Sequence, residues 1–202
     1  MDRRFLAYLE LRQDFLFDKI PKDKIMSYID RSLQMGDEKV QLLSSRDINT
    51  LLGKAGIEIE HNEGSGDFFK VKLRAQFEYD PKGKNKIILY HQSIQEFSER
   101  SGLDLQKAID LHLVHEYFHY LESRESKSVP ERLEPVVNFE FLGLKKRAHI
   151  NRCSEIAAHA FTQKYLDIEM LPNGYDFQYL INKGEITEAY LRELEASYQA
   201  IS

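Results

Sequence analysis

The sequence predicts an α+β fold, in which a small antiparallel sheet packs with a mainly helical core. Apolar residues recur at helical spacing near both ends of the chain, whereas residues 56–91 alternate between apolar and polar. The length of 202 residues suits one domain, and no repeat or long linker divides it. We therefore expect a single domain over 1–202, with the N-terminal helix 1–21 and the C-terminal helical tail 172–202 as possible appendages.

Glycine and proline residues mark the ends of the expected helices. Pro21 stops the first helix, Gly36 ends the second, and Gly53 with Gly56 ends the third. The helices are expected at residues 1–20, 22–35, 38–54, 93–100, 104–123, 145–168 and 185–200. Pro130 and Pro135 keep the segment between 123 and 145 as a loop.

Alternating residues indicate strands in the first half of the chain. Residues 56–61 form one strand, and a turn at 64–66 leads to a second over 67–80. Residues 81–85 then close a hairpin onto a third strand, "KIILYH" at 86–91.

Composition limits the classes of partner. The net charge of −5 and the pI of about 5.8 give no field that attracts nucleic acid. No apolar run approaches the roughly 18 residues of a membrane span, and the N-terminus lacks the apolar core of a signal peptide. A single cysteine excludes an internal disulfide. We expect a cytoplasmic protein without nucleic-acid or membrane partners.

The segment "LHLVHEYFHYL" at 111–121 contains the pattern H-E-x-x-H. His115 and His119 lie one helical turn apart, so both imidazoles can bind one ion, and Glu116 can reach a water on that ion. A lone histidine is more often a packing residue. Here the apolar neighbours favour a half-buried helix that can hold a metal rigidly: Val114, Tyr117, Phe118 and Leu121.

A catalytic zinc ion needs a third protein ligand. The metzincin spacing is excluded, because no glycine and third histidine follow His119. Glu155 is the preferred candidate, since the small residues around it allow two helices to approach closely. The alternative acids are Glu122, Glu131, Glu134 and Glu140, of which the last three lie in the proline-broken loop.

"HEYFH" followed by "EIAAHAFT" at 155–162 resembles the ImmA/IrrE family of zinc metallopeptidases, which pair H-E-x-x-H with a later E-x-x-A-x-x-F-A segment. The upstream order also fits, with a helix leading to "LLGKAGIEIE", a hairpin and "KIILYH". The resemblance covers about residues 24–172. It implies a gluzincin-type peptidase with Zn²⁺ on His115, His119 and Glu155 and with Glu116 as base. Such proteins are typically bacterial or phage-borne, and often cleave a regulatory protein such as a repressor.

Two departures from the family pattern stand out. "QKAIDLHLV" replaces the usual residues at the entrance of the motif helix. His159 stands where related gluzincins have Asn or Asp, a position that orients a zinc-bound imidazole. His159 therefore has three open roles, which are orienting the ligand, facing the substrate or the metal-bound water, and packing in the helix.

Further residues are candidates for a place near the metal or the substrate. His112 shares the ligand arc and is expected to line the cleft, because a fourth protein ligand would close the site. An additional oxyanion donor is expected among His159, Tyr165, Tyr175 and Tyr179. The strand "KIILYH" is expected to pair with an extended substrate.

These observations predict a zinc metallo-endopeptidase that hydrolyses an intracellular, possibly regulatory, protein or peptide. Glu116 would take a proton from the zinc-bound water and pass it to the leaving amine. The alternative is a non-catalytic binding or regulatory module on the same scaffold. The presence of Glu116 favours the enzyme, because a pure binding protein needs no base beside the ligands.

Overall fold

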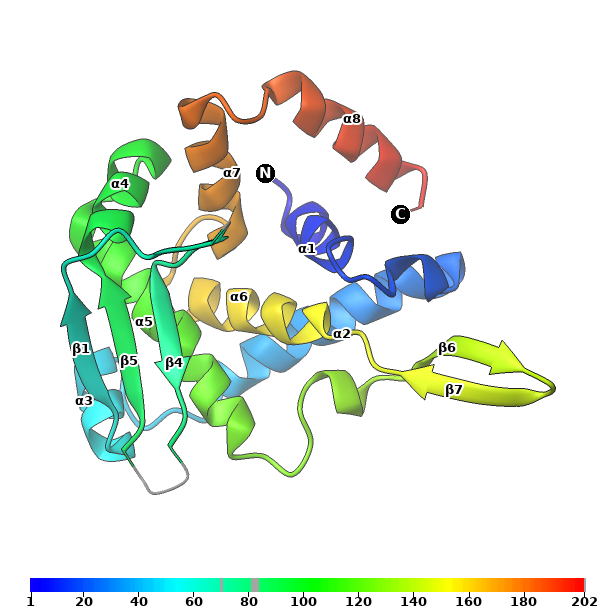
Figure 1. The fold of residues 1–202 in the computed structure, drawn as a ribbon, viewed down its shortest axis with the longest axis horizontal. Coiled ribbons are helices and arrows are strands. Elements are labelled where there is room, and N and C mark those ends of the chain that lie inside the picture. The colour runs from blue at the N-terminus through cyan, green and yellow to red at the C-terminus, as the bar shows by residue number, and fades with distance from the viewer. Residues whose placement is uncertain (70, 81–83, 202) are drawn as a thin grey trace.

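A small sheet lies at one side of a mainly helical body in the computed structural model, which describes residues 1–69, 71–80 and 84–201 (Figure 1). This arrangement confirms the predicted α+β class. The helices are α1 (Arg3–Leu11), α2 (Ile25–Gln41), α3 (Ile48–Ala55), α4 (His91–Ser101), α5 (Leu105–Ser123), α6 (Arg152–Leu166), α7 (Pro172–Lys183) and α8 (Glu188–Gln199). The strands are β1 (Glu58–Asn62), β2 (Asp67–Phe68), β3 (Val71–Lys72), β4 (Ala75–Glu78), β5 (Lys86–Tyr90), β6 (Val136–Phe141) and β7 (Leu144–Ala148). Within these described residues, no helix combines the length and apolar composition that a membrane span needs.

The main sheet contains the expected antiparallel pairing and, in addition, one parallel pairing. Its strand order is β1-β5-β4, with β4 antiparallel and β1 parallel to β5. β4 pairs along one edge of β5, and β1 pairs along the other edge in the parallel direction. The predicted turn at 81–85 falls mostly on residues 81–83, which lie outside the described residues.

The expected strand at 67–80 is divided into β2, β3 and β4. Phe69 has a φ of 54°, a left-handed conformation that no continuous strand contains. β2 and β3 therefore pair with each other as a short separate ribbon, and β4 alone joins the main sheet.

Helix α2 passes through Gly36, although this glycine was expected to end it. Gly36 lies against α6, where a Cβ would be only 2.2 Å from the carbonyl oxygen of Ala157. The glycine therefore permits a close helix–helix approach rather than a helix end. The chain leaves the helix after Gln41 and starts α3 at Ile48, where the side chain of Asp47 caps the backbone amide of Thr50. The single helix expected at 38–54 is wrong for this reason.

A hairpin occupies the segment before α6, where the sequence predicted a loop and then a helix from residue 145. β6 and β7 pair through a turn at Leu142 and Gly143, which have φ angles of 48° and 81°. Helix α6 begins only at Arg152. The hairpin extends away from the body of the molecule (Figure 1).

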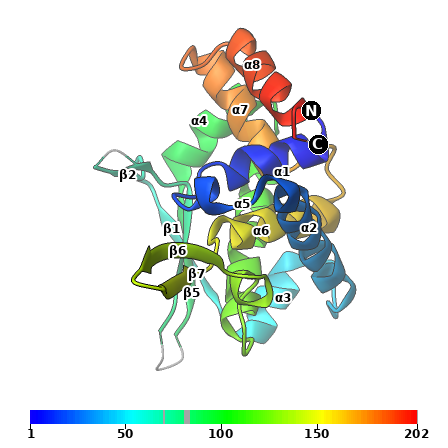
Figure 2. The same ribbon diagram turned by 90° about the vertical axis from the view of Figure 1, so that its right-hand side faces the viewer.

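The two ends of the chain meet on one side of the molecule (Figure 2). α1 is buried along most of its length, and Leu6 and Leu11 are fully covered. α8 has no buried residue, and its Tyr198 packs against the rings of Phe5 and Tyr8. The N-terminal helix is therefore part of the main core, whereas α8 covers it from outside.

Candidate metal centre

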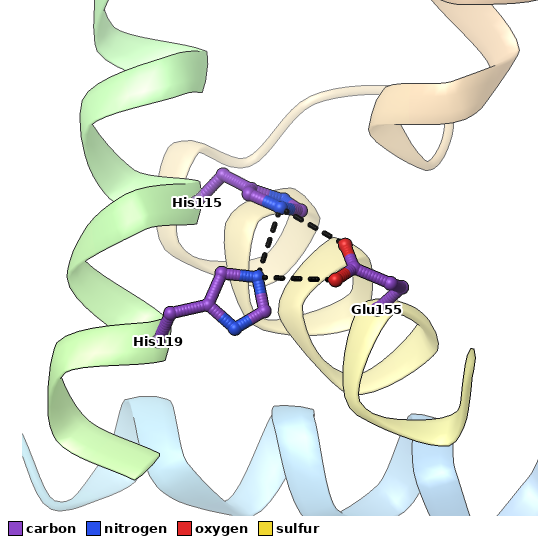
Figure 3. Close-up of side chains that lie close together, drawn as sticks. All are labelled: His115, His119 and Glu155. Atoms are coloured by element: carbon purple, nitrogen blue, oxygen red, sulfur yellow. Dashed lines mark hydrogen bonds and ion pairs between the residues drawn. The ribbon is translucent and has the colours of Figure 1, made fainter. Parts of the chain in front are cut away.

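Helix α5 carries the histidine motif through the middle of the molecule. Asp104 caps its N-terminus by accepting a hydrogen bond from the amide of Lys107, at 2.9 Å. One face of α5 is fixed by the core, where Val114 and Phe118 are fully buried. His115 and His119 project from the neighbouring face toward α6 (Figure 3). The core side chains thus fix the direction of both imidazoles.

His115, His119 and Glu155 converge between α5 and α6 (Figure 3). The Nε2 atoms of the two histidines lie 3.2 Å apart. Glu155 places Oε2 3.3 Å from Nε2 of His115 and Oε1 3.6 Å from Nε2 of His119. The three side chains that the sequence selected are therefore brought together from two helices.

This donor set fits a zinc ion. A tetrahedral site with bonds of ~2.0–2.1 Å separates its ligand atoms by about 3.3 Å, which is close to the three distances above. Two imidazole nitrogens and one carboxylate are also ligands that zinc commonly takes. The triad leaves a fourth tetrahedral direction without a protein ligand among the described residues. The arrangement can hold a divalent cation and keep one position open.

The carboxylate of Glu155 and the imidazole of His119 each stabilise the charged form of the other. Burial raises the pKa of Glu155, but the two imidazoles outweigh it and hold that pKa far below its usual value. Burial likewise lowers the pKa of His119, but Glu122 and Glu155 outweigh it and raise that pKa to about 10. The site therefore keeps its carboxylate ionised and attracts positive charge.

Glu122 contacts the other side of the His119 ring. Its Oε2 lies 3.8 Å from Nδ1 of His119 and accepts a hydrogen bond from Ser154 Oγ at 2.5 Å, and its Oε1 accepts one from the amide of Val129 at 2.7 Å. A carboxylate at Nδ1 leaves Nε2 as the free ligand atom. Glu122 therefore orients a ligand instead of joining the triad.

The other acids weighed as third ligands lie in different ion pairs or hydrogen bonds. Glu131 accepts from Ser128, Glu134 pairs with Lys24, and Glu140 pairs with Lys145. None of them belongs to the group that can hold a metal among the described residues.

Glu116 points toward the sheet and the same cleft. Its Oε2 accepts a hydrogen bond from the amide of Phe77 in β4, at 3.0 Å. That bond fixes one carboxylate oxygen and leaves the other for a second partner. Glu116 thus sits between the edge of the sheet and the two histidines that flank it in the sequence.

The triad opens into a cleft of about 450 Å³. Its walls come from segments far apart in the sequence, including α1, β4, α5, α6 and α7. His115, Glu116 and Glu155 line it together with five further charged residues: Glu10, Lys72, Arg74, Arg152 and Asp176. The two segments that sequence analysis treated as possible appendages supply part of this wall.

His112 and His159 both line the cleft and are both neutral. His112 donates from Nδ1 to the carbonyl oxygen of Ala108 at 2.6 Å, and burial together with Arg74 lowers its pKa to about 3. His159 packs 5.2 Å from the ring of His115, and burial followed by that neighbour lowers its pKa to about 3. Within the described residues, the buried Nδ1 of His159 has no hydrogen-bond partner.

The tyrosines named as oxyanion donors lie elsewhere. Tyr179 donates to Glu96 at 2.9 Å, and Tyr165 stacks on Phe161 with a buried hydroxyl. Tyr175 is buried in α7. The described lining of the cleft contains none of the three.

The strand "KIILYH" cannot pair with a substrate, which corrects that expectation. β5 lies between β1 and β4, so both of its edges are already paired. The edge strands of this sheet are β1 and β4, and β4 packs against α5.

Sequence reasoning missed several cleft residues. The spacing of His119 and Glu122, three apart on one helix, is a signal that could have placed Glu122 at the imidazole. Glu10 pairs with Arg152 at 2.8 Å across 142 positions of sequence, and no local pattern indicates such a contact. A comparison of the chain with models of protein families, with curated proteins and with solved structures finds no match.

Proposed function

We propose that the protein is a zinc-dependent metallopeptidase that hydrolyses peptide bonds of a protein substrate. The convergence of His115, His119 and Glu155 around a space of tetrahedral size is the observation that carries this proposal. The motif resemblance to the ImmA/IrrE family supports the same reading, including an intracellular regulatory protein as substrate.

The residues of the cleft have different roles in the proposed hydrolysis. His115, His119 and Glu155 would hold the zinc ion, which would supply a Lewis acid for the peptide carbonyl and lower the pKa of water at the site toward ~7. Glu116 accepts a proton from the attacking water on its carboxylate and returns it to the amine nitrogen when the C–N bond breaks. Glu122 holds the His119 ring in the orientation that presents Nε2.

The edge of β4 is the surface we propose for the substrate backbone. The amide of Phe77 points away from β5 and toward the cleft, because it donates to Glu116. Antiparallel pairing directs the backbone groups of Ala75, two residues earlier, to the same side. An extended peptide laid along this edge would have its carbonyl groups close to Glu116 and the triad.

Metal content and turnover test the proposal together. We expect one zinc ion per chain by elemental analysis, and loss of that zinc in His115→Ala and His119→Ala. Glu116→Gln should keep the zinc and lower the hydrolysis of a pooled fluorogenic peptide library by about 10²–10⁴-fold, the usual contribution of a general base.

Glu99→Gln is the matched control, because Glu99 is an exposed acid on α4 that accepts a hydrogen bond from Gln95. It should change neither zinc content nor turnover. A folded wild-type protein that takes up no zinc would overturn the proposal. Stoichiometric zinc without hydrolysis that depends on Glu116 would support a binding module instead.

A further inference from the structure

Arg74 lines the cleft, and its guanidinium lies against the ring of Phe97, which also contacts His112. His112 lies about one helical turn before the ligand His115. Arg74 immediately precedes β4, and its carbonyl oxygen accepts the amide of Tyr90 at 2.9 Å. Its side chain is only 20% exposed, although the residue lines the cleft. The guanidinium is therefore held in place by the fold before any ligand arrives.

Three contacts fix this guanidinium. It lies 4.2 Å from the ring centre of Phe97 and 5.0 Å from that of Tyr179, a packing that immobilises its plane. Nη1 donates to Oδ1 of Asp176 at 2.5 Å. A guanidinium has five N–H donors, and within the described residues this is its one side-chain hydrogen bond. Donors therefore remain for another acceptor.

Arg74 and Lys72 are the cationic side chains of this part of the cleft, and each pairs with one carboxylate. Arg74 pairs with Asp176, and Lys72 pairs with Glu96. The unused N–H donors of Arg74, and not an excess of positive charge, are therefore what this part of the cleft offers to an acceptor. A fixed guanidinium binds carboxylates through two parallel hydrogen bonds, which gives selectivity as well as affinity.

We propose that Arg74 binds a carboxylate of the peptide substrate, from either an acidic side chain or the chain's C-terminus, within a residue or two of the cleaved bond. This inference rests on the proposed peptidase function. The distance along the peptide follows from His112, because three helical residues, a rise of about 4.5 Å, separate it from the ligand His115 and an extended residue spans about 3.3–3.6 Å.

Peptide binding without turnover tests the inference. Glu116→Gln protein, with and without zinc, is titrated against three labelled hexapeptide pools by fluorescence anisotropy. One pool has a free C-terminus and no Asp or Glu, the second is amidated and contains Asp and Glu, and the third is amidated without either. We expect one of the first two pools to bind about tenfold tighter than the third, in line with a charge-assisted hydrogen bond. The pool that binds more tightly than the third identifies the source of the carboxylate.

Arg74→Gln in the same background should reduce that preference to less than twofold, and Arg74→Lys should retain only part of it. Arg192→Gln, which changes an exposed arginine on α8, should keep the full preference. A purely structural role for Arg74 would weaken all three pools equally and leave their ratio unchanged.

Equal binding of the three pools, a preference that survives Arg74→Gln, or no binding of any pool would each overturn the inference. A preference that depends on Arg74 in a protein whose wild type hydrolyses nothing would overturn the peptidase proposal alone. Hydrolysis without the preference would overturn only the carboxylate subsite.

Discussion

At the scale of single residues, the ring of His119 is held between two carboxylates. Glu155 faces Nε2, and Glu122 faces Nδ1 while it also accepts the hydroxyl of Ser154 and the amide of Val129. The three contacts of Glu122 fix its carboxylate, so that the imidazole it touches is fixed as well. An outer carboxylate of this kind raises the basicity of a metal-binding imidazole.

Glu122→Gln should therefore weaken zinc binding by about 10–100-fold, the usual effect of losing such a partner. The protein should still fold, because glutamine keeps the shape of the side chain. Competition with a chromogenic zinc chelator measures the change. Glu131→Gln, in the loop that follows α5, is the control and should bind zinc like the wild type. Equal affinity in Glu122→Gln would show that the contact with His119 has no influence on the metal.

Glu10 makes the stability of the zinc-free protein depend on pH. Burial raises its pKa to about 7, despite the guanidinium of Arg152 at 2.8 Å. Because the pKa is higher in the folded state than in the unfolded state, the folded protein holds its proton more tightly. The resulting stability is complete below the unfolded pKa of about 4.3 and is lost as the pH rises through about 7.

We expect the free energy of unfolding of the wild type to fall relative to Glu10→Gln between pH 4.5 and 7.5, by up to about 3 kcal/mol. Urea unfolding of the metal-free proteins at several pH values measures this difference. Removing zinc matters here, because a nearby cation would lower the pKa of Glu10. A difference between the two proteins that stays constant with pH would contradict the prediction.

At the scale of elements, local patterns predicted the helices that carry the chemistry, and tertiary contacts decided the rest. The H-E-x-x-H spacing placed His115 and His119 on one face of α5, because helical periodicity alone fixes that geometry. The hairpin of β6 and β7 was missed, since its residues are exposed on both faces and show no clean alternation. The parallel pairing of β1 with β5 depends on which strand edges remain free, and no local pattern records that.

At Gly36 the sequence predicted a helix end, whereas α2 continues through this residue. In isolation, a glycine at this position indicates a helix end. In the fold it removes a side chain where α2 crosses α6, the helix that carries Glu155. This contact therefore supports the position of a candidate ligand.

Gly36→Ala should lower the free energy of unfolding by about 1–3 kcal/mol, because its Cβ would overlap the backbone of Ala157. Gly53→Ala is the matched control, since Gly53 lies in α3 with no atom within 4 Å of the added Cβ. That change should be neutral or stabilise the protein by up to about 1 kcal/mol through helix propensity. Urea unfolding compares the two variants, and similar effects from both would show that α2 and α6 do not touch at Gly36.

At the scale of the whole molecule, the cleft is assembled from both ends of the chain. α1 contributes Glu10, and α7 contributes Asp176. The two helices also contact directly, because the side-chain amide of Asn173 donates to the carbonyl oxygen of Leu6 at 2.9 Å. Helix α1, which lies outside the motif region, thus packs in the core and also forms part of the wall of the candidate site.

This arrangement predicts opposite outcomes for two truncations. Deleting residues 1–13 removes Leu6 and Leu11, whose full burial contributes about 1.5–3 kcal/mol each, along with their buried neighbours. That loss approaches the total stability of a typical domain, about 5–15 kcal/mol, so the shortened protein should not fold or bind zinc. Deleting residues 186–202 removes α8, which has no buried residue, and should leave a folded protein that melts at a lower temperature and still holds its zinc. Circular dichroism melting and zinc analysis distinguish the two cases, and cooperative unfolding of the first truncation would mean that α1 is an appendage after all.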